Sequence, residues 1–154
     1  MSERASRPAV GWWRRLCSWF LTLRAAGHRH FGDLYADRES FEKAVFDLTR
    51  AIELDAGNAG ALLMRGTIYW RELNIPERAV QDLTRVLQLI PGHAEALFQR
   101  GCARINAGDA AGARQDLEEY LRRFPAGGWS EHARRLREML DEVPLQEDGA
   151  GRTE

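Results

Sequence analysis

Apolar residues recur along the chain at the spacing of helices that bury one face. Leu62 and Tyr69 lie seven residues apart in one segment, and Leu83 and Leu87 lie four apart in the next. Side chains at such intervals share one face of a helix with about 3.6 residues per turn. Turn-forming residues separate the segments, as in the Gly-Asp pair at residues 108–109, where a helix stop precedes a helix cap. The pattern predicts an all-α chain of short helices.

The helical pattern also repeats. Segments 43–55 ("KAVFDLTRAIELD"), 78–91 ("RAVQDLTRVLQLIP") and 112–125 ("GARQDLEEYLRRFP") align at a period of about 34 residues. Small residues let the backbones of two crossing helices approach each other. The repetition therefore predicts three antiparallel helix pairs, with small residues at their crossing points. A glycine before each segment and an alanine within it are the expected contacts: Gly32, Gly66 and Gly101, and Ala44, Ala79 and Ala113.

This scheme resembles the tetratricopeptide repeat family, whose helix-turn-helix pattern places Gly and Tyr in the first helix, Ala in the second and Pro at the end. The resemblance covers residues 25–127. It implies a right-handed α-solenoid of three repeats, at residues 25–58, 59–93 and 94–127. A capping helix is expected over residues 128–141, and a disordered tail over residues 142–154.

The resemblance also implies a function, because such repeats hold peptides or helices of other proteins on the face lined by their first helices. Leu63, Trp70, Phe98 and Ile105 are expected to form an exposed apolar patch there, unless the chain's own amino-terminal segment covers it. Only Arg29 suits a clamp for a terminal carboxylate, and Asp33 would partly cancel its charge. The residues predicted to line this groove are Arg29, Asp33, Leu63, Thr67, Trp70, Phe98, Cys102 and Ile105.

Residues 1–24 form a basic, tryptophan-rich extension, with an amphipathic helix expected over residues 10–23. Six arginines and one acid, Glu3, give the first thirty residues a charge of about +5. Three interpretations stay open: contact with a membrane surface or membrane-protein complex, docking to a soluble partner, and packing on the first repeat. Arg14 and Arg15 share the polar side with Gly11, Ser18 and Thr22. The apolar arc comprises Trp12, Trp13, Leu16, Trp19, Phe20 and Leu23.

Catalytic and cofactor motifs are missing from the sequence: it has no phosphate-binding loop, no nucleophile elbow and no H-E-x-x-H metal helix. Cys17 and Cys102 stand far apart and suggest neither a zinc site nor a disulfide, and the His28–His30 pair lacks further ligands at suitable spacing. Because the repeats are net acidic, nucleic acid is not an expected partner. We expect no enzyme activity, cofactor or metal.

Together these observations predict a cytoplasmic adaptor or assembly scaffold for another protein, peripheral at a membrane if its amino-terminal helix binds there. The apolar run from Leu16 to Leu23 is too short to span a bilayer. The alternative hypothesis is a chaperone for a secreted protein, similar in length and repeat number to the small chaperones of type III secretion systems.

Overall fold

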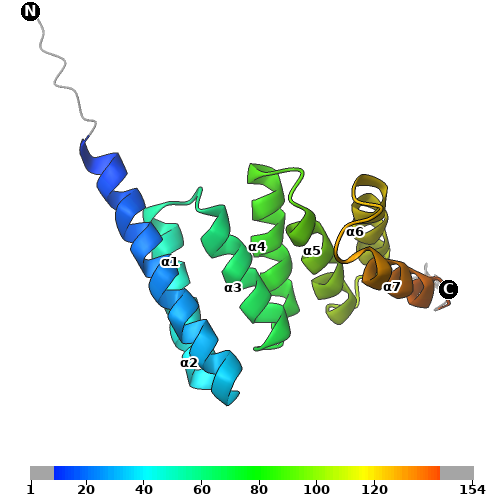
Figure 1. Cartoon of the computed structure of the whole chain (residues 1–154), viewed down its shortest axis with the longest axis horizontal. Helices are drawn as coiled ribbons and strands as arrows, with labels where there is room; N and C mark the ends of the chain where they lie inside the picture. The colour runs from blue at the N-terminus through cyan, green and yellow to red at the C-terminus, as the bar shows by residue number, and fades with distance from the viewer. Residues whose placement is uncertain (1–8, 143–154) are drawn as a thin grey trace, which may run out of the picture.

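The computed structural model describes residues 9–142 of the chain's 154. Within these residues the chain forms seven α-helices and no strand (Figure 1). The helices are α1 (Ala9–Tyr35), α2 (Arg38–Leu54), α3 (Ala59–Arg71), α4 (Pro76–Leu89), α5 (Ala94–Asn106), α6 (Ala110–Arg123) and α7 (Ser130–Glu142).

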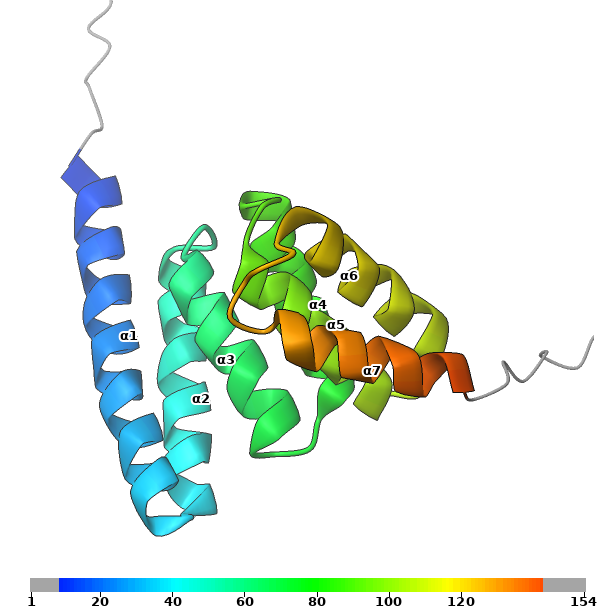
Figure 2. The ribbon, with the colours of Figure 1, turned by 45° about the vertical axis from the view of Figure 1, so that its right-hand side comes forward.

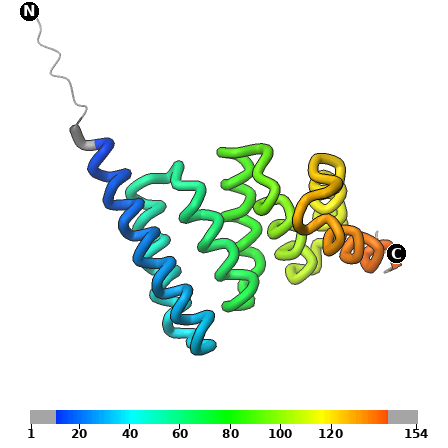
Figure 3. Tube along the Cα trace, viewed as in Figure 1, coloured from blue at the N-terminus to red at the C-terminus, as the bar shows by residue number. Residues whose placement is uncertain are grey.

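The helices stack as consecutive antiparallel pairs along the long axis of the molecule (Figures 1 and 3). Helix α1 packs on α2, α3 on α4, and α5 on α6, while α3 and α5 also pack on the second helix of the preceding pair. Helix α7 packs on α6 at the carboxyl end. The expected all-α solenoid of three helix pairs is confirmed. Of the expected tail, only Glu142 lies within the described residues.

Short polar side chains cap three of the helices. Asp37, Asn58 and Asp109 each accept a hydrogen bond from a backbone N–H in the first turn of the helix that follows. Such a cap pairs a donor that would otherwise have no partner. Gly108, with φ of +80°, stops α5 just before the Asp109 cap, as the sequence predicts.

Helix α1 is longer than expected. No proline interrupts residues 9–35, and the helix runs on to Tyr35, where Ala36, with φ of +50°, and the Asp37 cap end it. The predicted separation of an amino-terminal helix from the first repeat, between residues 24 and 25, is therefore wrong. The two segments form one helix of 27 residues.

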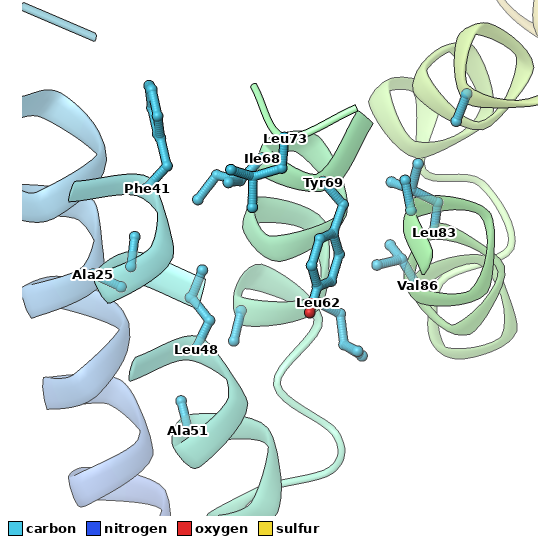
Figure 4. Close-up of a cluster of buried hydrophobic side chains, with 14 of the residues drawn as sticks. Ala25, Phe41, Leu48, Ala51, Leu62, Ile68, Tyr69, Leu73, Leu83 and Val86 are labelled. Carbon is cyan, nitrogen blue, oxygen red and sulfur yellow. The ribbon is translucent and has the colours of Figure 1, made fainter. Parts of the chain in front are cut away.

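The core lies between the pairs (Figure 4). Leu48 and Ala51 of α2 and Leu62 of α3 are buried in one apolar cluster, which continues into α4 through Leu83. A second cluster joins α5, α6 and α7. The second-helix alanines at 44, 79 and 113 are fully buried, as expected for close helix contacts.

In each helix pair, an arginine of the first helix pairs with a buried aspartate of the second. Arg65 of α3 donates from Nε and Nη2 to Asp82 of α4 at 2.8 and 2.7 Å, and Arg100 of α5 pairs with Asp116 of α6 at 2.9 and 2.6 Å. In α1, Arg24 Nε donates to Asp47 of α2 at 2.7 Å. All three aspartates are buried, so each carboxylate needs a cation for charge compensation, and Asp116 receives a second one from Arg104, whose Nη1 donates to it at 2.9 Å.

The same arginines also link neighbouring pairs. Arg65 Nη1 donates to Thr49 of α2 at 2.9 Å, and Arg100 Nη1 donates to Thr84 of α4 at 3.2 Å. Thr49 and Thr84 each stand two residues after the paired aspartate of their own unit. Each of these guanidinium groups therefore fixes both the crossing within its unit and the stacking on the unit before it.

These pairs change the alignment of the first unit. Gly66 and Gly101 directly follow their arginines, and a Cβ at either would lie about 3.1–3.2 Å from Leu83 or Leu117. In α1 the residue after the paired arginine is the fully buried Ala25. Gly32, predicted to be their equivalent, instead lies against the ring of Phe41. Gly66 and Gly101 therefore contact leucine side chains of the second helices. These leucines stand four residues after the buried alanines at 79 and 113.

The aspartate pairs give a stability prediction with a control inside the chain. Asp82→Ala would leave the half-buried Arg65 without its counter-charge, so we expect a loss of about 2–4 kcal/mol in the free energy of unfolding. Asp47→Ala should cost clearly less, because water reaches the partner Arg24. Guanidinium titrations followed by circular dichroism measure both. Equal losses in the two variants would show that burial of the arginine does not decide the effect.

Candidate functional site

Two adjoining pockets lie along the face formed by the first helices, and together they are called the groove below. The arginine pocket has a volume of about 600 Å³ between α1, α2 and α3. The aromatic pocket has a volume of about 360 Å³ between α3, α5 and the start of α7. Arg71 of α3 lines both pockets. A segment of another chain that filled one pocket would therefore lie next to the other.

The arginine pocket carries charges of both signs. Arg29 and Asp33 come from α1, Arg38 from α2, and Arg71 and Glu72 from the end of α3. Arg71 lies 3.8 Å from Glu72, whereas the buried Nε of Arg29 has no hydrogen-bond partner among the described residues. A buried donor without an acceptor costs free energy. Because Arg29, Arg38 and Arg71 all line this pocket, an acidic group entering it would meet cationic side chains.

The aromatic pocket is walled by stacked rings. Trp129, in the loop before α7, stacks on Phe98 of α5 with ring centroids 5.5 Å apart and planes 7° apart. Trp129 keeps 38% of its surface exposed, whereas Phe98 beneath it is buried. The pocket therefore offers exposed indole surface to an apolar side chain.

A polar chain orients the residues between the two pockets. Gln99 Oε1 accepts from Thr67 Oγ1 at 2.5 Å and from Trp70 Nε1 at 3.4 Å. Gln99 Nε2 donates to Glu95 Oε1 at 2.8 Å. The guanidinium of Arg71 lies over the ring of Trp70, 5.9 Å from its centroid. These contacts hold Trp70 at the boundary between the pockets.

Six of the eight predicted groove residues line the two pockets, and two do not. Arg29, Asp33 and Thr67 line the arginine pocket, and Trp70, Phe98 and Cys102 line the aromatic pocket. Leu63 and Ile105 are half-buried against the core clusters and line neither pocket. The expectation of an exposed apolar patch is therefore wrong in part, because Phe98 is buried under Trp129 and Ile105 is half-buried against the second core cluster.

Several residues that line the groove are not among those predicted from the sequence. Arg71 directly follows the predicted Trp70, and Gln99 directly follows the predicted Phe98. Glu95 stands three positions before Phe98 on the same helix. Spacing along α3 and α5 could have identified them. Trp129 and His132 could not be assigned in this way, because they reach the pocket from the loop and helix that follow the last repeat.

Helix α1 lies against its neighbours through its polar side. The fully buried Ser18 donates from Oγ to the carbonyl of Ala51 at 2.8 Å, and Asn58 Nδ2 donates to Ser18 and to Thr22 at 2.9 and 3.1 Å. Arg14 donates to the carbonyl of Glu53 at 3.2 Å, and Arg15 lies 3.6 Å from Asp55. This side of the helix is thus fixed by hydrogen bonds to α2 and the start of α3.

The apolar arc of α1 points away from the rest of the chain. Its six residues keep 46–60% of their surface exposed. The amino-terminal helix therefore does pack on the first repeat, as one interpretation expects, but through its polar side, and the apolar arc stays uncovered. The described part of the amino-terminal segment does not cover the groove, so that expectation is wrong. Contact with a membrane and contact with another protein remain as interpretations of the arc.

Neither a membrane span nor a metal centre is found within residues 9–142. In this range no helix combines the length and apolarity needed to cross a bilayer. The same range contains no cluster of three or more His, Cys, Asp or Glu side chains placed to bind a metal ion.

Comparison with known families identifies the repeats. Two family models, both described as Tetratricopeptide repeat, match residues 30–58 and 66–141, which together exceed half of the chain. The chain belongs to the tetratricopeptide repeat family. A comparison with curated proteins gave no match.

Solved structures share the fold. The first TPR of Spaghetti (RPAP3), bound to the HSP90 peptide SRMEEVD, matches with a TM-score of 0.71 at 20% identity, covering 82% of this chain and 95% of that one. The Arabidopsis OM64 TPR domain matches with a TM-score of 0.70 at 24% identity, covering 82% and 98%. The Yersinia enterocolitica type III secretion translocator chaperone SycD matches with a TM-score of 0.65 at 15% identity, covering 84% of each chain.

Cys102 reports on the closure of the aromatic pocket. Burial raises the pKa of its thiol to about 11, so at pH 8 only on the order of one thiol in a thousand is ionised. We expect iodoacetamide to alkylate Cys102 at least about 100-fold more slowly in the folded chain than in guanidinium. Peptide mass spectrometry over a time course measures both rates. Similar rates would mean that the wall of the pocket opens readily.

Proposed function

We propose that this chain is an adaptor or assembly scaffold that holds a segment of a partner protein in the groove. The observation that supports this proposal most directly is that two chemically different pockets adjoin along the first helices. One has an arginine donor that is unpaired within residues 9–142, and the other has exposed indole surface. A segment with an acidic group at one end and a bulky apolar side chain at the other matches both pockets.

Structures with this fold support the proposal. The Spaghetti domain is bound to an HSP90 peptide, and its second domain of the same kind, at 27% identity over 71% of this chain, is bound to the same peptide. That peptide, like the proposed segment, carries acidic residues. In this chain, Arg29, Arg38 and Arg71 would meet the acidic group, with Asp33 and Glu72 limiting the net charge of the pocket.

The proposal includes a place of action. Helix α1 attaches the scaffold to a membrane-embedded complex, so that the protein is cytoplasmic and peripheral at the membrane. The support is the apolar arc, which the rest of the described chain leaves uncovered. A helix with basic residues and exposed tryptophans suits the boundary between a membrane and water.

A chaperone for a secreted protein is the second candidate, favoured by the likeness to the Yersinia translocator chaperone. The two candidates differ in what they hold. A scaffold retains a folded subunit of a stable complex, whereas a chaperone retains an unfolded export substrate. Purification of the chain with its bound partner, followed by limited proteolysis of that partner, separates them: rapid digestion throughout the partner favours the chaperone.

The groove gives a binding prediction that can be checked before the natural partner is identified. Peptides selected from a random phage-displayed library are titrated against the chain by calorimetry. Trp70→Ala and Trp129→Ala should each weaken binding by about 1–3 kcal/mol, because each removes aromatic surface from the same pocket. Arg29→Ala should weaken it less and should reduce its dependence on salt, because one charged contact is lost.

The matched control is Phe46→Ala, which removes an aromatic ring that is 65% exposed on α2, outside the groove. This variant should bind like the parent. Melting temperatures of all four variants exclude unfolding as the cause. Unchanged affinity in both tryptophan variants would place the binding site elsewhere and would contradict the proposal.

A further inference from the structure

The uncovered face of α1 extends beyond the predicted arc. Between Trp12 and Leu34, the positions on the side opposite α2 hold only Trp, Leu, Phe, Gly and His. Phe31 and Leu34, which lie beyond the predicted amino-terminal helix, continue the face with 58% and 62% of their surface exposed. At about 1.5 Å per residue the face is roughly 33 Å long. It carries no Asp, Glu, Lys or Arg.

In the other units, the corresponding side of the first helix is buried. When the paired arginines are aligned, Phe20 corresponds to Ala61 of α3 and to Ala96 of α5, which are both fully buried. Those two helices have a preceding second helix packed on this side. Helix α1 stands at the edge of the described structure with α2 on one side only (Figures 1 and 2).

The paired arginines differ in exposure in the same way between α1 and the inner units. Arg24 has 52% of its side-chain surface exposed, whereas Arg65 and Arg100 have 16%. The inner arginines are covered by the preceding unit, with which they form the threonine hydrogen bonds. The face of α1 therefore lies where the rest of the solenoid would place a neighbouring helix.

Side-chain size disfavours a helix as the cover. Close packing in the inner units depends on small residues such as Ala61 and Ala96 at the contact. At the corresponding place α1 has Phe20, flanked by Trp13 and Trp19, and these rings would hold a second helix at a distance. A lipid bilayer is fluid, so its molecules can rearrange around projecting aromatic rings and no matching groove is needed. Tryptophan is also enriched where hydrocarbon meets water.

Charge favours an anionic surface over a second copy of the chain. Between Trp12 and Leu34, α1 has four arginines and one acid, Asp33, which lines the groove. Arg15, at the margin of the face, has 79% of its side-chain surface exposed. Two such helices pressed together would bring like charges to the rim of the contact. Phosphate groups of acidic lipids would instead meet the exposed Arg15 favourably.

We infer that the face of α1 from Trp12 to Leu34 binds the surface of an anionic lipid bilayer directly, with the helix lying in the plane of the interface. This inference rests on the proposed location of α1 at a membrane, and it assigns lipid rather than a membrane-embedded protein as the surface that α1 contacts. Apolar side chains on such helices insert about 5–10 Å, to the boundary of the acyl chains. Helix α2 then lies on the side of α1 away from the lipid, because α2 packs on the side of α1 opposite this face.

The test is flotation of the intact chain with vesicles of phosphatidylcholine, with and without phosphatidylglycerol. Binding is expected to the anionic vesicles and to fall as salt rises. Phe20→Glu and Leu34→Glu should each lower the partition coefficient at least about tenfold, because each puts a like charge and a polar group into the inserted face. Phe46→Glu, on exposed α2 surface, should bind like the parent.

All three substituted residues are exposed, so the melting temperatures should stay close to that of the parent. If Leu34→Glu binds the vesicles like the parent, the lipid-binding face does not extend to Leu34, which would overturn the inference as stated. Equal binding to neutral vesicles would overturn the role of charge. Dimers seen by light scattering, lost in Phe20→Glu and accompanied by no vesicle binding, would make the face a contact between copies and overturn the inference.

Failure of the lipid inference can be distinguished from failure of the proposed function. The library-selected peptides bind the groove, whose Trp70 and Trp129 do not belong to the face of α1. Lost vesicle binding with intact peptide binding would reject the lipid inference alone. Capture by a detergent-solubilised membrane complex without vesicle binding would also reject it, and would leave the proposed attachment in place.

Discussion

The pairing of an arginine with a buried aspartate is the contact on which the arrangement of this chain depends. A carboxylate taken out of water requires a matched cation, and the geometry of two parallel hydrogen bonds allows little rotation or sliding of the helices that carry them. Arg65 and Arg100 apply this constraint within their units and, through Thr49 and Thr84, to the units before them. Arg24 applies the same constraint to α1 but has no preceding unit in the described structure to cover it. The orientation of α1, and thus the direction in which its tryptophans point, follows from that pair together with the hydrogen bonds of Ser18 and Asn58.

Helix α1 consequently reverses the usual relation between an amphipathic helix and its core. Ser18 and Thr22 face the protein, where Asn58 and the Ala51 carbonyl satisfy them, and the apolar side faces outward. The groove lies on different residues, and its two pockets combine a buried arginine donor with indole surface. The chain thereby presents two chemically distinct surfaces on one stack of helices, which the proposed scaffold between a membrane and a partner protein would require.

The sequence predicts the fold well because period, helix caps and apolar spacing are local signals, and the Gly108–Asp109 turn follows from them. The alignment of the first unit failed because Gly32 has the right spacing from Gly66 but follows Phe31 rather than an arginine. The Arg-small pairs at residues 24–25, 65–66 and 100–101 are visible in the sequence, yet their meaning depends on aspartates 16–23 residues away. Trp129 was missed because its place over Phe98 is set by the path of a loop after the last repeat, which no periodicity describes.

The five tryptophans allow both surfaces to be observed in a single measurement. Indole N–H signals of the nitrogen-15-labelled chain are recorded with a soluble gadolinium chelate, first alone and then with anionic nanodiscs. Trp12, Trp13 and Trp19 should be relaxed strongly by the chelate in lipid-free solution, because they are exposed, and should become protected when nanodiscs are added. The protection of Trp70 and Trp129 should not change with lipid and should increase only when a groove-binding peptide is added. Protection of the three α1 tryptophans already in lipid-free monomer, or lipid protection of the groove pair instead, would contradict the outward-facing orientation of α1 and the separation of the two surfaces.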